Sequence, residues 1–380
     1  MTLSTRSVFV PSDSSARSVG ADAVAAAAEA HPAGFTVHRN GSRGLYWLEP
    51  MVEFDTDDGR LAFGPVTAEE FASLIDADGV LDTSHARCLG RVDELEWLTR
   101  QDRLTFARVG ATRPLSIDDY RAHGGFAGLE KALSLSPADI VAAVKESGLR
   151  GRGGAAFPTG IKWQTVLDTP ASQKYIVCNA DEGDSGTFAD RMIMESDPYV
   201  LIEGMTIAGL ATEATRGYVY LRAEYPQAIS TMNAAIERAV EAGWLGDSVN
   251  GSGREFHLEV REAAGAYICG EETSLLESLE GKRGMVRYRP PLPAVEGFMG
   301  KPTVVNNVIS LATVPIILAK GAAFYRDYGV GRSRGTLTLQ LAGNVARGGL
   351  FEVPFGLTLK EVLYDLGGGT ASGRPIKAVQ

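Results

Sequence analysis

The sequence predicts an α/β protein in which helices cover a sheet, and three observations lead to that prediction. Strand and helix patterns alternate between residues 136 and 242, which is typical of α/β sheets. The chain has 380 residues, enough for two or three domains of about 100 to 200 residues each. Glycine supplies 44 of the 380 residues, about 12% against an ordinary ~7%, so the backbone has unusual conformational demands.

The first 80 residues predict a small α+β unit. Its expected elements are, in order, a strand over 5–10, a helix over 20–30 and an antiparallel meander over 35–63. Thr67, with Glu70 three residues later, forms a capping box that opens a short helix toward Ile75. Residues 81–125 mix charges with isolated aromatics and show no sustained period, so we expect a connector there.

Residues 126–334 predict the main α/β domain. Ser136 as N-cap, Pro137 at the first helical position and Asp139 in the first turn predict a helix that ends near Ser147. The next expected elements are a glycine-rich loop over 148–160, a strand over 174–178, a helix after 198, a strand over 217–221 and a helix over 226–242. The strands TLTLQLAG and GLFEVPFG and a helix over 359–366 predict a third, small unit over 335–380.

Composition and charge exclude several classes of function. A net charge of -10 and a pI near 5.2 disfavour nucleic acid as a partner. The apolar stretch over 308–319 is shorter than the ~20 residues that span a bilayer, and the N-terminus lacks the apolar core of a signal peptide. We therefore expect no direct contact with a membrane and a cytoplasmic location. Cys88, Cys178 and Cys269 are far apart, so we expect no disulfide scaffold and no metal site.

The segment GLRGRGGAAFPTGIKW, residues 148–163, is suited to a phosphate. Glycines let backbone amides approach the anion, and cations neutralise it. The cations are Arg150, Arg152 and Lys162. Gly151, Gly153 and Ala156 fit the dinucleotide fingerprint G-x-G-x-x-A, but here a helix precedes the motif, where the fingerprint requires a strand. A flexible turn between helix and strand is the alternative.

Two acidic segments are candidates for binding. NADEGD, residues 179–184, follows the strand over 174–178 directly, where open α/β sheets place ligands. Its carboxylates can hold a cation, a ribose diol or a flavin edge, and a solvated acidic turn is an equally good interpretation. GAYICGEET, residues 265–273, predicts an apolar strand followed by a helix. Glu271 and Glu272 then have a structural explanation in the helix dipole.

Two further segments carry polar groups of ambiguous role. A basic strip follows the second acidic segment and contains Lys282, Arg283, Arg287, Arg289 and Lys301. A solvated loop explains it equally well. In PTVVNNV, Asn306 and Asn307 enter a helix as good N-cap residues, and their amides can also hold a phosphate or a flavin. Cys269 has no histidine nearby in sequence, so we interpret it as a small buried residue.

Taken together and in this order, the glycine-rich, NADEGD, GAYICGEET and PTVVNNV segments resemble the flavin subunit of respiratory complex I and its relatives in NAD-dependent formate dehydrogenases and NAD-reducing hydrogenases. The resemblance covers about residues 116–380. It implies a Rossmann-like FMN/NADH-binding domain, a vestigial thioredoxin-like domain over 1–80 and an incomplete β-grasp-like unit over 335–380. It also implies hydride transfer between nicotinamide C4 and flavin N5, with no catalytic side chain.

The resemblance assigns site residues by position. Those implied to bind FMN are Gly151, Arg152, Gly153, Gly154, Lys162, Asn179, Asp181, Glu182, Tyr267, Gly270, Glu271, Val305, Asn306 and Asn307. Those implied to face the nucleotide are Phe157, Asp184, Glu272 and Arg289. Relatives often carry aromatic residues where Thr165 and Leu292 stand, and Glu where Asp184 stands, so Phe157 remains as the main stacking platform. Glu182 and Glu272 are expected to tune the flavin potential.

The resemblance also implies partners. The N-terminal extension favours the β subunit of a soluble molybdenum formate dehydrogenase, with hydrogenase and complex I diaphorases as alternatives. The partners would be NAD(H), an iron-sulfur subunit with a two-iron cluster and a molybdenum catalytic subunit. The ligands of a four-iron, four-sulfur cluster are expected only beyond Gln380, so we expect a truncated or partly recorded chain. A flavin-free scaffold that docks partner subunits is the alternative of another class.

Overall fold

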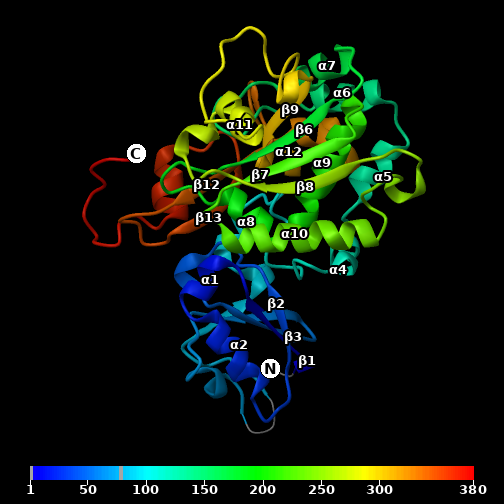
Figure 1. The fold of residues 1–380 in the computed structure, drawn as a ribbon. Helices are drawn as coiled ribbons and strands as arrows, with labels where there is room; N and C mark the ends of the chain where they lie inside the picture. The colour runs from blue at the N-terminus through cyan, green and yellow to red at the C-terminus, as the bar shows by residue number, and fades with distance from the viewer. Residues whose placement is uncertain (1–2, 77–79) are drawn as a thin grey trace.

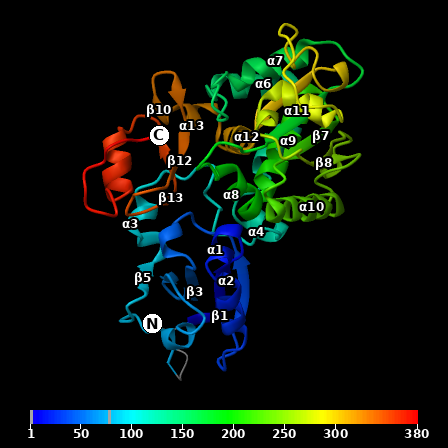
Figure 2. The same cartoon turned by 60° about the vertical axis from the view of Figure 1, so that its left-hand side comes forward.

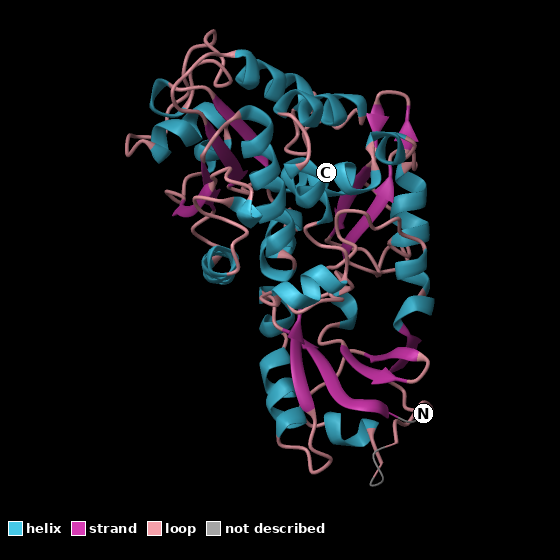
Figure 3. Ribbon diagram, turned by 90° about the vertical axis from the view of Figure 1, so that its right-hand side faces the viewer, coloured by secondary structure: helices cyan, strands magenta, loops and turns pink. Residues whose placement is uncertain are grey.

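A computed structural model describes residues 3–76 and 80–380. Figure 1 shows a small N-terminal unit, in blue, beneath a larger body whose central sheet is green and yellow. The C-terminal unit, in orange and red, lies beside that body. Figure 3 shows the strands gathered in separate groups, with the N-terminal sheet well apart from the central one.

The N-terminal unit contains a five-stranded sheet of order β2-β1-β3-β4-β5. Its strands are β1 Leu3–Pro11, β2 Thr36–Asn40, β3 Val52–Thr56, β4 Gly59–Phe63 and β5 Cys88–Arg91. Helix α2, Ala21–Glu29, carries the chain back across the sheet, so β2 runs parallel to β1. The other neighbours pair antiparallel. The expected antiparallel meander over 35–63 is therefore wrong for its first strand and confirmed for the β3–β4 hairpin.

The capping box is present, although the element that it opens is short. The Thr67 N–H donates to Glu70 Oε2 at 3.1 Å, and the Glu70 N–H donates to Thr67 Oγ1 at 3.3 Å. Only the 3₁₀ turn Phe71–Leu74 follows. Residues 81–125 were expected to be a connector, but they contain strand β5. This strand pairs with β4 as the fifth strand of the sheet.

Helix α1, Ser14–Ser18, joins the N-terminal unit to the main domain. The Ser14 N–H and Oγ donate to the Glu195 carboxylate at 2.7 and 2.6 Å. Glu195 belongs to α8, which lies above α1 in Figure 2. Because this carboxylate is buried, its two hydrogen bonds offset the cost of removing it from water.

The main domain is built on a parallel sheet of order β8-β7-β6-β9. Its strands are β6 Tyr175–Ala180, β7 Arg216–Leu221, β8 His257–Glu262 and β9 Thr303–Asn307. Successive residues of β6 face opposite sides: Ile176 and Cys178 pack against one core cluster and Val177 against another. Strands β6 and β7 and their helices confirm the expected α/β fold, whereas β8 and β9 were not predicted.

Helices cover both faces of the central sheet. They are α6 Pro137–Glu146, α7 Thr159–Asp168, α8 Ala189–Ser196, α9 Pro198–Thr212, α10 Pro226–Glu241, α11 Glu272–Leu279 and α12 Val308–Lys320. Every residue of α9 is buried, as a helix that is apolar all round must be. The cap expected for α6 is confirmed, because Ser136 Oγ accepts the Asp139 N–H at 3.2 Å.

The C-terminal unit contains both expected strands, β12 Thr336–Leu341 and β13 Gly349–Pro354, which pair antiparallel. A helical segment runs from Leu359 to Leu366, as predicted, with a π-helical turn over Glu361–Leu366. Throughout the described residues, each helix is too short or too polar to cross a bilayer.

Candidate functional site

The topology of the central sheet places a candidate site at the carboxyl ends of β6 and β9. From β6 the chain proceeds to β7 and β8 on one side, and β9 then returns to the other side of β6. Open α/β sheets bind ligands at such a switch point. Asn179 and Asn307, each near the end of its strand, lie directly opposite one another in the register.

Two adjoining cavities, of about 530 and 520 Å³, open at this edge. Both are lined by Gly153, Asn179, Gly270, Glu271 and Asn307. The first cavity is also lined by Arg152, Gly154, Asp181, Glu182, Asp184 and Tyr267. The second is also lined by Gly151, Phe157, Lys162, Glu272, Arg289, Val305 and Asn306. The structure thus brings together all the residues expected at FMN or the nucleotide, while the role of each stays a prediction.

The glycine-rich loop passes close to the end of β9. A Cβ added to Gly153 would lie 3.2 Å from Asn307 Cβ, which is tighter than ordinary contacts allow. Gly154 adopts a left-handed conformation with φ of +99°. The Gly151 N–H donates to Phe157 O at 2.9 Å and closes the loop on itself. Glycine therefore favours the close approach at 153 and the left-handed backbone at 154.

The two loop arginines bind protein acceptors. Arg152 donates to Arg150 O at 2.8 Å, to Arg334 O at 2.7 Å and to Tyr325 Oη at 2.8 Å. Arg150 Nε donates to Ala156 O at 2.7 Å. These side chains fasten the loop to itself and to the start of the C-terminal unit. Both guanidiniums have protein partners, and the expectation that they neutralise a phosphate stays a prediction.

Lys162 is the remaining cation of this segment, and it faces the second cavity. Its Nζ donates to Val305 O at 2.6 Å and lies 3.2 Å from Glu272 Oε2. Helix α7 carries this lysine, and that helix was not predicted from the sequence. The ammonium thus sits at the switch point with one carboxylate partner.

The acidic loop after β6 offers a buried acceptor. Asn179 Nδ2 donates to Gly270 O at 2.8 Å, and the Asp181 N–H donates to Asn179 Oδ1 at 3.3 Å. Asp181 is only 9% exposed, and its Oδ2 has no hydrogen-bond partner among the described residues. Burial, with a smaller contribution from Glu224, raises the pKa of Asp181 to about 6. A ligand that donates a hydrogen bond here would satisfy this oxygen.

Glu182, which is partly buried, and the buried Asp190 form a carboxyl pair beside Asp181. Glu182 accepts the N–H groups of Asp190 at 3.2 Å and Arg191 at 3.1 Å, so it caps the start of α8. Burial raises the pKa of Glu182. Burial and the charge of Glu182 raise the pKa of Asp190 well above its usual range, so the pair favours keeping a proton. Asp190 lines the first cavity and was missed, because α8 was not predicted.

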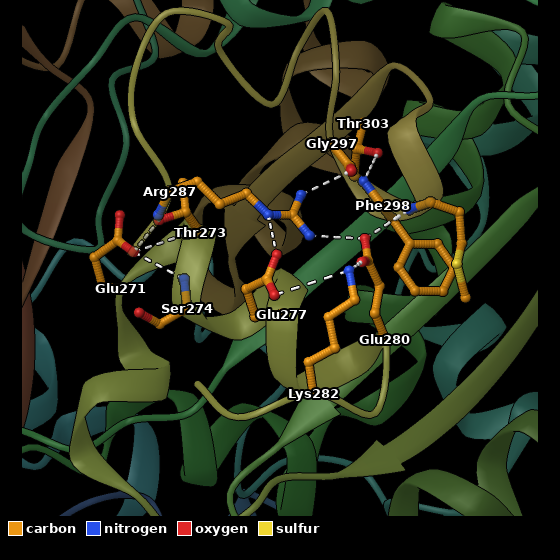
Figure 4. Close-up of polar contacts among 11 residues, drawn as sticks. Glu271, Thr273, Ser274, Glu277, Glu280, Lys282, Arg287, Gly297, Phe298 and Thr303 are labelled. Atoms are coloured by element: carbon orange, nitrogen blue, oxygen red, sulfur yellow. Dashed lines mark hydrogen bonds and ion pairs between the residues drawn. The ribbon is translucent and has the colours of Figure 1, made fainter. Parts of the chain in front are cut away.

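The segment before α11 corrects one expectation. Residues 265–269 were expected to form a strand, but Tyr267–Gly270 is a 3₁₀ turn. Glu271 is the N-cap of α11, and its Oε2 accepts the N–H groups of Thr273 and Ser274, both at 2.9 Å. Figure 4 shows this cap. The structural explanation of Glu271 is confirmed. Glu272 instead points at cations, with Arg289 Nη1 at 2.9 Å from its Oε1.

The two asparagines after PTVV have different positions. Asn307 Oδ1 accepts the Ser310 N–H at 3.1 Å, so Asn307 is the predicted N-cap, that of α12. Asn306 still belongs to β9, and its Oδ1 accepts the Trp163 Nε1–H at 2.9 Å. Both amides are therefore fixed in orientation at the cavity wall.

Exposed aromatic side chains lie at the mouths of the cavities. Phe157 is 49% exposed at the second cavity, as a stacking platform for a base would be. Tyr267 is 73% exposed at the first cavity, where its hydroxyl donates to Asp184 Oδ1 at 2.6 Å. Thr165 and Leu292, which stand where relatives often have aromatics, also line the second cavity.

The C-terminal unit completes the first cavity. Gln340 Oε1 accepts the N–H groups of Phe188 and Ala189 at 2.8 and 3.2 Å. Leu337 and Thr338 of the same strand also line the cavity. These residues were missed from the sequence, because the strand TLTLQLAG carries no binding motif.

The residues present fit an FMN. A glycine-rich loop gives a close backbone approach for a phosphate, and Lys162 supplies a cation. The unpartnered Asp181 Oδ2 supplies an acceptor for a hydroxyl or ring N–H. Among the described residues, the one group of His, Cys, Asp or Glu side chains spaced closely enough to hold a metal ion is Asp247, Glu255 and His257, which lies outside both cavities. The three cysteines are unpaired.

The fold and the site define a Rossmann-like flavin-binding domain. Residues 144–316 match the family described as the Nuo51 FMN-binding domain. The cofactor of this domain is FMN.

Similar proteins were found among characterised sequences. The HndC component of the NADP-reducing hydrogenase of Solidesulfovibrio fructosivorans is 50% identical over 281 residues, 74% of this chain and 57% of the relative. The F component of the NADH-quinone oxidoreductase of Escherichia coli K12 is 46% identical over 288 residues, 75% of this chain and 63% of the relative. The chain thus spans about 60% of the length of these relatives.

Solved structures of NAD+-reducing [NiFe]-hydrogenase are also similar. In the air-oxidised state, one chain aligns with 30% identity and a TM-score of 0.61. The alignment covers 94% of this chain and 60% of the hydrogenase chain. In the H2-reduced state the identity is 31% and the TM-score 0.61, with coverage of 99% and 62%.

Proposed function

We propose that this protein is the diaphorase component of a multi-subunit oxidoreductase and exchanges a hydride between NAD(H) and FMN. The observation that carries the proposal is the pair of adjoining cavities at the β6–β9 switch point. Two cavities that share five wall residues suit two ring systems that must stack. When bound, FMN supplies the redox chemistry, and the protein binds, orients and excludes water.

Each group of residues has a task in this proposal. The glycine-rich loop and Lys162 hold the phosphate of FMN, and Asp181 accepts a hydrogen bond from a hydroxyl or ring N–H of the cofactor. Phe157 and Arg289 receive the nucleotide at the more exposed rim of the second cavity. Glu182 and Glu272 place negative charge beside the flavin and lower its tendency to accept electrons.

The electrons then pass to an iron-sulfur partner subunit, and the identity of the whole complex is the finer part of the proposal. The N-terminal unit favours a formate dehydrogenase, with a molybdenum catalytic subunit. The NAD+-reducing hydrogenase chains also align over at least 94% of this chain, so they extend over that unit too. A hydrogenase or complex I context therefore has equal support.

Reduction of the purified complex by its donor distinguishes these contexts. Under anaerobic conditions and with NAD+ present, formate should produce NADH if the partner is a molybdenum formate dehydrogenase. Hydrogen gas should do so if the partner is a hydrogenase. If neither donor produces NADH while NADH itself reduces the flavin, the complex I context is supported.

A further inference from the structure

A long loop forms one wall of the second cavity. It occupies residues 281–302 between α11 and β9 and is the arching yellow segment of Figure 1. Apart from the 3₁₀ turn Phe298–Gly300, it contains no regular element. In the first part of the loop the apolar side chains do not hold it in place, because Met285 and Val286 are more than half exposed and Tyr288 is 97% exposed. Nearer to β9, Ala294 and Phe298 are buried.

Arg287 fastens this loop to α11. Its Nε lies 2.5 Å from Glu277 Oε1, and its Nη2 lies 2.8 Å from Glu280 Oε1. Its Nη1 donates to Gly297 O at 2.9 Å, ten residues further along the same loop. Figure 4 shows the guanidinium between the two glutamates and Gly297. One side chain therefore ties the middle and the end of the loop to the helix.

Glu280 is the buried centre of this arrangement. Its side chain is only 5% exposed, and it accepts the Met299 N–H at 2.8 Å and Lys282 Nζ at 2.7 Å in addition to Arg287. Two cations thus face two carboxylates, counting Glu277, so the buried charge is balanced. Loss of Arg287 would leave Glu280 short of a partner, which is costly for a desolvated carboxylate.

Arg289 connects this network to the proposed site. Two residues after Arg287, its guanidinium lies 2.6 Å from Glu271 Oε1 and 2.9 Å from Glu272 Oε1. Leu292, on the same loop, also lines the second cavity. The side chain of Arg289 is 41% exposed, so its two ion pairs are weak surface interactions and do not by themselves fix its position. The part of the loop before Ala294 must therefore be held by other contacts.

We propose that Arg287, through Glu277 and Glu280, is a positioning residue that holds the 281–302 loop so that Arg289 and Leu292 form the nucleotide wall of the second cavity. This inference rests on the proposed function for the nature of the ligand. Arg287 itself does not line that cavity, so it acts only through the loop.

Arg287→Gln tests the inference, with Arg287→Lys as the conservative variant and Arg283→Gln as the matched control. Arg283 lies on the same loop, is exposed, and makes no hydrogen bond or ion pair within the part of the chain that the structure describes. Hydrogen exchange over residues 284–300, measured without cofactor, should be faster in Arg287→Gln and unchanged in the control. Exchange that is as slow as in the wild type would overturn the inference.

Kinetics on the FMN-loaded full chain, with NADH and ferricyanide, supply the second measurement. Arg287→Gln should raise the KM for NADH about tenfold, as expected for a misplaced binding wall, with kcat and FMN content within twofold of wild type. The KM of Arg287→Lys for NADH should lie between those of the wild type and Arg287→Gln. An unchanged KM, or a loss of FMN equal to the loss of NADH binding, would contradict a positioning role. If the wild type and the Arg283→Gln control fail to react with NADH, the proposed function fails instead, and the hydrogen-exchange result still stands.

Discussion

Asp181→Asn should stabilise the FMN-free protein at neutral pH and have no such effect in acid. Burial raises the pKa of this carboxyl from 3.8 to about 6, and its Oδ2 has no partner in the described chain. A folded-state pKa above the unfolded value means that ionisation destabilises the fold. The penalty is absent below about pH 4, grows between about 4 and 6, and is complete above about 6.

The size of the effect follows from the same shift. A difference of about two pKa units corresponds to about 3 kcal/mol at 1.36 kcal/mol per unit. Water in the open cavity screens the charge, so we expect about 1–2 kcal/mol of stabilisation in the variant at pH 8.

The assay is urea denaturation of FMN-depleted wild type and variant at pH 4 and pH 8, followed by circular dichroism. Glu241→Gln, at an exposed position at the end of α10, is the control and should shift the free energy of unfolding equally at both pH values. The reasoning is refuted if Asp181→Asn changes stability by the same amount at pH 4 and pH 8, or if it destabilises the protein at pH 8.

Three further substitutions test the flavin cavity. Gly153→Ala should weaken FMN binding at least about tenfold in a fluorescence titration, because its Cβ would press on Asn307. Gly151→Ala is the control and should bind FMN normally, because its Cβ would meet its nearest atom at an ordinary 3.6 Å. Lys162→Met should weaken FMN binding by about ten- to a hundredfold through loss of the cation, and an unchanged Kd would disprove that role. Glu272→Gln should raise the flavin midpoint potential, measured by spectroelectrochemistry, and change the Kd for NADH, measured by titration. If neither quantity changes, tuning by this carboxylate is ruled out.

The sequence predicted the buried strands and capped helices of the main domain well. Residues 174–178 and 217–221 are apolar runs, and the Ser136 cap is local, so nearby residues determine these elements. Strand β8, HLEVRE, was missed because it is a charged edge strand with one covered face. The parallel β1–β2 pair was missed because only the crossover of α2 determines strand direction.

The site was predictable where chemistry lies in contiguous motifs. The glycine-rich loop and the acidic loop after β6 carry their own signals, and the resemblance supplied the roles. The side-chain partners of Arg152 and the contribution of Gln340 depend on the C-terminal strands packing back onto the main domain. Asp190 required knowledge of where α8 begins. Contacts between distant segments leave no mark in local sequence.

A visible spectrum of the purified chain, recorded anaerobically before and after addition of NADH, tests the central claim most directly. The proposed function predicts a yellow protein with flavin absorbance near 450 nm, about one FMN per chain, and bleaching of that absorbance by NADH. A colourless protein that does not take up added FMN, or a yellow one that NADH fails to bleach, would contradict it. The colourless result would favour a scaffold that docks partner subunits.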